Sequence, residues 1–139
     1  MRVSIRTDRV KMLGVRGSTE LKANIAHSHL GAVIQACAGS EFNVPSKIMN
    51  YLAVGLRIVA SVNPESEAAS TVREAGAGWI ADSAKPADFA GSVVEALSDP
   101  DELTKRGEAG ASFAPANLTP DVLADKFEEA IGNLDGPRR

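Results

Sequence analysis

The sequence has little of several features that would each define a class of protein. It contains a single cysteine, Cys37, which excludes an internal disulfide framework and fits a reducing compartment. Cys37 adjoins an apolar run, which favours a buried, inert thiol over a nucleophile. There is no apolar run of the length that spans a bilayer and no pattern typical of a signal peptide. We therefore expect a cytoplasmic protein without a transmembrane segment.

Positive charge is also scarce. Lys and Arg total 15 against 18 Asp and Glu, and the basic residues form no block. This balance argues against electrostatic binding of nucleic acid or of an anionic membrane. The two histidines, His27 and His29, are spaced so that a helix would point them to different faces. With no convergent Cys, His or carboxylate partners suggested, we expect surface or capping roles for them and no metal site.

The residues that are present predict one α/β domain. The length of 139 residues suits a single domain and is too short for two nucleotide-binding folds. Apolar segments expected to be strands alternate with amphipathic segments expected to be helices, which indicates a parallel sheet with right-handed crossovers. Residues 2–6 form either a further short strand or an irregular lead-in. The strands are expected at 9–14, 30–35, 58–62 and 79–81, and the helices at 18–28, 45–54, 64–75, 86–97, 101–113 and 119–134.

Ligands of parallel sheets bind beyond the carboxyl ends of the strands. The loop over residues 36–44 and the segment 61–63 both lie at that edge. Pro45 and Ser46 are typical of a helix start, where Ser46 can cap exposed N–H groups, and Gly55 is typical of the position just past a helix end. A polar loop that leads into a helix N-terminus favours anion binding, and Lys47 adds a positive charge there.

The stretch from residue 40 to residue 61 resembles a known family. It reads Ser-Glu-Phe-Asn-Val-Pro-Ser-Lys-Ile-Met-Asn-Tyr-Leu-Ala-Val-Gly-Leu-Arg-Ile-Val-Ala-Ser. This is similar to the donor-site motif of family 4 glycosyltransferases of the GT-B architecture, above all the bacterial pattern Pro-Ser-Lys, Tyr-x-Ala-x-Gly-x-Pro-Val-x-Ala. Weaker similarities at residues 9–14, 30–35 and 75–80 extend the resemblance over roughly residues 9–130.

The resemblance implies a partial GT-B C-terminal domain with a Rossmann-like fold over residues 1–134, followed by a disordered tail at 135–139. It implies sugar transfer from a nucleotide-diphosphate sugar with retention of configuration, in bacterial polysaccharide or glycoconjugate synthesis, without a metal or cofactor. The acceptor domain and the first two strand-helix units of the donor domain have no counterpart in the chain, which alone is expected to be inactive. No catalytic residue is assigned. The donor sugar and diphosphate would contact Glu41, Phe42, Asn43, Val44, Ser46 and Lys47, and the ribose would contact Asn50.

Two of these site residues also have a purely structural interpretation, and other positions depart from the family pattern. Glu41 can neutralise Lys47 or the helix dipole, and Lys47 can be an ordinary solvated lysine. Asn50 stands where most of the family has a glutamate, and the residue eight positions before it is Phe42 instead of the first glutamate of the family pair. Arg57 replaces the proline that usually precedes the strand. The last difference leaves the path of that strand open.

Two other functional interpretations remain. The chain can be an inactive remnant or regulatory module that binds a nucleotide sugar, or an unrelated doubly wound domain that matches by chance. The missing units also predict an open sheet edge. We expect residues 9–13 to pair directly with the strand at 30–35, and the remaining edge to favour self-association or an acceptor-domain partner.

Overall fold

The computed structural model describes residues 7–36 and 44–134 of the chain. It contains a parallel sheet of three strands in the order β1-β2-β3, flanked by helices, which is consistent with a Rossmann-like fold. The expected α/β class and parallel pairing are confirmed. The strands are β1 (Leu30–Ile34), β2 (Arg57–Val62) and β3 (Gly78–Asp82).

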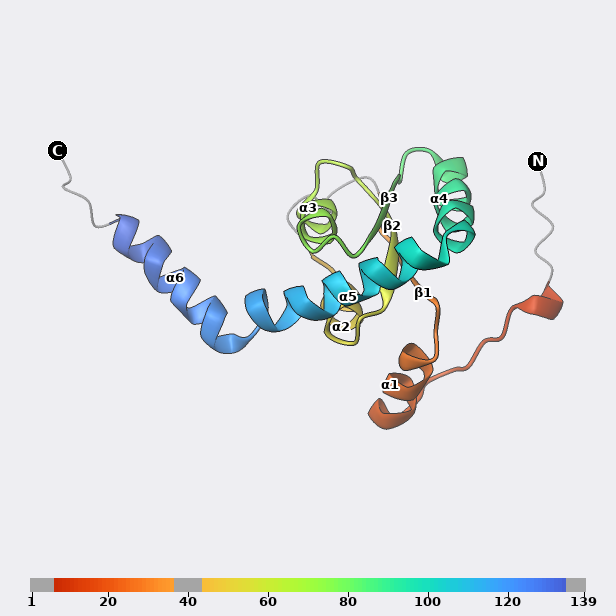
Figure 1. The fold of residues 1–139 in the computed structure, drawn as a ribbon, viewed down its shortest axis with the longest axis horizontal. Helices are drawn as coiled ribbons and strands as arrows, with labels where there is room; N and C mark the ends of the chain where they lie inside the picture. Colours follow the sequence, from red (N-terminus) through yellow and green to blue (C-terminus); the bar gives the residue numbers. More distant parts are fainter. Residues whose placement is uncertain (1–6, 37–43, 135–139) are drawn as a thin grey trace.

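The helices cover the sheet unequally. On one face α2, α3 and α5 enclose the larger core. On the other face α4 packs together with Leu103 of α5, so that α3 and α4 lie on opposite sides of the sheet (Figure 1). The final helix, α6, extends away from the body of the domain (Figure 1). The helical elements are the 3₁₀ turn η1 (Thr7–Arg9), α1 (Ser18–Ala26), α2 (Ser46–Ala53), α3 (Glu67–Glu74), α4 (Pro86–Ser98), α5 (Pro100–Asn117) and α6 (Pro120–Leu134).

The strand β2 lies at the centre and is buried on both faces. Its apolar run Ile58-Val59-Ala60 fits this position, because the middle strand of a parallel sheet has helices above and below it. Ile58, Ala60 and Val62 belong to the larger core with residues of α2 and α3, whereas Val59 belongs to the smaller core with Trp79. The two cores therefore follow the alternation of side chains along β2.

Arg57, which stands where the resembled motif has a proline, connects β2 to α5. Its Nε donates a hydrogen bond of 2.8 Å to the carbonyl oxygen of Leu103. The guanidinium lies so close to Gly107 that a Cβ there would be 2.6 Å from Nε. The strand begins at Arg57, one residue before the predicted start at 58, and the arginine has a packing role that a proline cannot have.

Local signals explain most helix boundaries. Gly55 has a φ of +67°, which only glycine adopts without strain, and it follows the end of α2 as expected. The helix predicted from residue 64 begins later, at Glu67, because Ser66 is its N-cap and accepts a hydrogen bond from the Ala69 N–H. Asp99 caps α5 by accepting from the N–H groups of Asp101 and Glu102.

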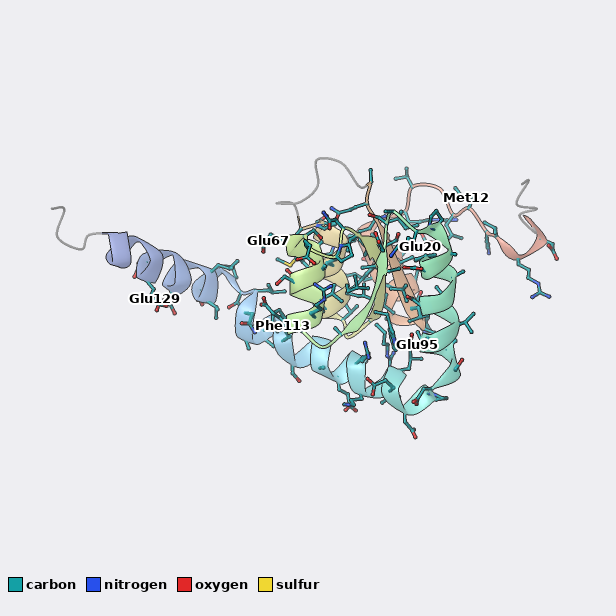
Figure 2. All side chains as sticks on the ribbon, turned by 90° about the horizontal axis from the view of Figure 1, so that it is seen from above. Met12, Glu20, Glu67, Glu95, Phe113 and Glu129 are labelled. Carbon is teal, nitrogen blue, oxygen red and sulfur yellow. The ribbon has the colours of Figure 1, made fainter. Side chains whose placement is uncertain are left out.

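The prediction of a strand at residues 9–14 is wrong. Arg9 ends a 3₁₀ turn, and the chain then runs as a coil in which the side chains of Val10, Met12 and Val15 are 55%, 89% and 104% exposed. Figure 2 shows Met12 on a segment outside the body of the domain. The following helix, α1, has no buried residue, so no packing holds this segment beside β1. The prediction that this segment pairs directly with β1 is therefore also wrong.

The strand β1 consequently has one open edge within the part of the chain that the structure describes. It pairs with β2 on one side, and no other described strand joins the sheet. The expectations for residues 2–6 and for the tail at 135–139 lie outside the described residues. Across the described ranges, no helix is both long and apolar enough to cross a membrane.

Candidate functional site at the carboxyl edge of the sheet

A hollow of about 570 Å³ lies where β1 ends and α2 begins. One wall is the end of β1, and the other is the segment that enters the first turn of α2. The hollow is at the carboxyl edge of the sheet, where the sequence predicted a ligand site. Its lining residues are Val33, Ile34, Gln35, Val44, Pro45, Ser46 and Lys47.

The position of α2 is fixed by burial of one of its faces. The side chains of Ile48 and Leu52 are fully buried in the larger core. Tyr51 packs against β1 so closely that a Cβ at Gly31 would lie 2.7 Å from a ring carbon of Tyr51. Burial raises the pKa of the Tyr51 hydroxyl above its ordinary value of 10.0. These contacts hold the first turn of α2 at a constant distance from the end of β1.

The N-terminus of α2 faces this hollow without a side-chain cap. Pro45 is the N-cap residue, and it has no side-chain hydrogen bond to the helix. The cap expected from Ser46 does not form, because Ser46 is the first helical residue and lies one position too late to cap the turn. The N–H groups of Ser46 and Lys47 have no acceptor within the helix. The helix dipole favours negative charge beside these N–H groups.

Lys47 is the cation of this hollow. Its side chain is exposed, and it makes no ion pair with any other residue that the structure describes. Its charge lies within the first helical turn, so that its field adds to the field of the helix N-terminus. A diphosphate is the kind of ligand that both fields stabilise.

The structure describes four of the seven predicted site residues. Three of them, Val44, Ser46 and Lys47, line the same hollow. Asn50 is exposed on the following turn of α2 and lines two other hollows, one with α1 and one with the junction of α5 and α6. Its predicted contact with ribose stays a prediction. The remaining residues, Glu41, Phe42 and Asn43, lie outside the described residues.

Comparison with known proteins found no match among protein-family models, curated proteins or solved structures.

The structure also adds residues that the motif did not indicate. Gln35 follows β1, lines the hollow and is tied to β2 by a 2.9 Å hydrogen bond from its N–H to the Ser61 carbonyl. A smaller hollow of about 220 Å³ lies further along the same edge, lined by Asn63, Asp82 and two residues after β3. The carboxylate of Asp82 accepts from the Ala84 N–H and pairs with Lys85 at 3.4 Å. Position at a strand end was the sequence signal for these residues.

Among the residues that the structure describes, no group of three or more Cys, His, Asp or Glu side chains could hold a metal ion. The chemistry that this edge can perform with its own residues is anion binding, through N–H groups, a lysine and polar side chains.

Proposed function

We propose that this chain is the donor-binding part of a glycosyltransferase that uses a nucleotide-diphosphate sugar, related to family 4 of the GT-B architecture. The observation that carries the proposal is the position of Ser46 and Lys47. The Pro-Ser-Lys part of the motif forms the uncapped N-terminus of α2 and lines a hollow at the carboxyl edge of a parallel sheet. This is the position that the family resemblance implies for the residues that contact the donor diphosphate.

In this proposal the diphosphate occupies the hollow beside α2. The N–H groups of the first turn and the Lys47 ammonium stabilise the charge that develops on the diphosphate as the bond to the sugar breaks. Such stabilisation by prepositioned donors needs no metal ion. The retention of configuration, the acceptor domain, the polysaccharide pathway and the cytoplasmic location are parts of the same proposal and come from the family resemblance.

A second candidate is a module that binds the nucleotide sugar without transferring it. The observation that favours it is Asn50, which is neutral where the family has glutamate and which lines hollows other than that of Lys47. The chain would then bind the diphosphate but contact the ribose differently. This candidate shares the diphosphate site of the first and differs in the ribose contact and in the chemical step.

Calorimetric titration with uridine and guanosine diphosphate sugars tests the shared binding site. We expect Lys47→Ala to weaken binding by about 1 to 3 kcal/mol, the scale of a hydrogen bond to a charged group. Lys105→Ala is the matched control, because Lys105 is an exposed lysine on α5 that lines a different hollow. Equal affinity of the Lys47 variant and the wild type would remove Lys47 from the site, and absence of binding by every donor would contradict the proposal.

Release of nucleoside diphosphate separates the two candidates once a donor is known to bind. If a gene upstream encodes an acceptor domain, that domain is added to the chain with the bound donor, and free diphosphate is measured over time. Turnover that depends on Lys47 supports the enzyme. Binding without turnover supports the module.

A further inference from the structure

The open edge of β1 has an uncovered apolar face beside it. Ala32 lies opposite Val59 in the sheet register, and Val59 lies opposite Trp79, so these residues point to the face on which α4 packs. The helix α4 covers Val59 and Trp79, which are 1% and 6% exposed. Ala32 remains exposed, and Ile34, two residues further on, is 71% exposed. On this face of the sheet, therefore, α4 covers β2 and β3 but leaves Ala32 and Ile34 of β1 exposed.

The helix α4 carries an apolar stripe on the same side of the sheet. Ala90, Val94 and Leu97 recur at helical spacing next to the residues that α4 buries, and Val94 and Leu97 are 66% and 55% exposed. Parallel sheets are normally covered on both faces, and natural edge strands usually carry a charge or a proline. The strand β1 reads Leu-Gly-Ala-Val-Ile and has neither. Its edge is thus suited to accept another strand.

The same chain carries a segment suited to fill this edge. In Arg9–Leu13, the apolar Val10 and Met12 alternate with Arg9 and Lys11, which is the pattern of a strand with one apolar face. In the protomer this segment is exposed and pairs with nothing in the sheet. Gly14, with a φ of +68°, and Gly17 connect it to α1, which buries no residue, so the segment and α1 can turn about this connection.

We propose that two copies of this chain form a dimer in which the segment Arg9–Leu13 of each copy joins the β1 edge of the other. The exchange is reciprocal about one twofold axis, so the same contact forms twice and occupies the segment and the β1 edge of both copies. This contact is closed and does not extend into a filament. Val10 and Met12 of one copy then cover Ala32 and Ile34 of the other. The inference uses neither α2 nor Lys47. Ile34 also lines the hollow beside α2, so Met12 is the position that tests the dimer separately from the proposed ligand site.

Gel filtration with light scattering of the full chain, across a dilution series, tests for the dimer. We expect a dimer whose dissociation constant rises about tenfold or more in Met12→Glu and in Ile34→Lys, since each change places a charge against an apolar face. Both positions are exposed in the protomer, so these variants should keep the fold, which far-ultraviolet circular dichroism verifies. Leu123→Lys is the matched control, because Leu123 is an exposed leucine, 47% exposed, on α6. A monomer at high micromolar concentration would overturn the proposal.

Crosslinking identifies which segments meet. In a Cys37→Ser background, Met12→Cys and Ile34→Cys are made on separate chains, mixed, and treated with a short bismaleimide. Heterodimers that join position 12 to position 34 support the exchange. A dimer that crosslinks only through position 34 of both copies would mean that two β1 edges pair with each other, which contradicts the role given to Arg9–Leu13.

Discussion

Two glycines within helices should respond to the same substitution with opposite signs. Gly91 lies in α4, and a Cβ there would meet nothing within 4 Å. Gly107 lies in α5, and a Cβ there would be 2.6 Å from the Arg57 Nε and 2.9 Å from the backbone oxygen of Gly55. Gly55 cannot easily move away, because its φ of +67° ends α2. Substitution by alanine changes the helix propensity equally at both sites and the packing at only one.

The expected magnitudes follow from these contacts. At Gly91 only the helix propensity acts, and alanine should raise the free energy of unfolding by about 0.5 to 1 kcal/mol. At Gly107 the same gain is opposed by overpacking of about 1 to 3 kcal/mol. Displacement of Arg57 also breaks its hydrogen bond to Leu103, which costs about 1 kcal/mol more. The net expectation for Gly107→Ala is destabilisation by about 1 to 3 kcal/mol.

Urea denaturation at a single protein concentration measures both changes. Trp79 is the only tryptophan of the chain, is 6% exposed, and lies under the Arg106 guanidinium at 4.1 Å, so its fluorescence follows the loss of packing between β3 and α5. Circular dichroism gives an independent transition. If Gly107→Ala were as stabilising as Gly91→Ala, the close contact of α5 with Arg57 and Gly55 would be refuted.

Two further predictions concern a cap and a buried hydroxyl. Asp99→Ala should lower the free energy of unfolding by about 0.5 to 2 kcal/mol, because it removes the acceptor of two N–H groups at the start of α5, and Asp99→Asn should restore most of this loss in the same urea experiment. Burial raises the pKa of Tyr51 above 10.0, so its contribution to stability is complete below the unfolded pKa and is lost as the pH rises through the folded pKa. Tyr51→Phe should therefore lose less stability than the wild type as the pH rises past 10.0, and parallel losses in the two proteins would contradict this account.

The helices and the inner strands could be predicted because their signals are local. Apolar periodicity, Gly55 and Pro86 mark element boundaries through backbone geometry that does not depend on the rest of the fold. The failure at residues 9–14 has a different cause. Val10, Met12 and Leu13 have strand character, but a strand also needs a partner, and α1 has no buried face to bring the segment to β1.

The candidate site shows the same division. The motif correctly indicated that Ser46 and Lys47 begin a helix at the carboxyl edge of the sheet. It could not indicate Gln35, because no pattern within the motif reports which strand end lies across from α2. The direction in which the Asn50 side chain points depends on the rotation of α2 about its own axis. Packing of Ile48 and Leu52 against the sheet and α5 decides that rotation.

The strand order of the sheet has a consequence for how the chain folds. Strands that pair in the sheet are also consecutive along the chain. Each connection between them contains one helix that packs on the strands it joins. The mean sequence separation of contacts is therefore small for a parallel sheet, in contrast to doubly wound folds in which the order reverses and distant strands must meet. We expect β1, β2 and β3 to assemble in the order of synthesis, with every intermediate presenting the edge that the next strand requires.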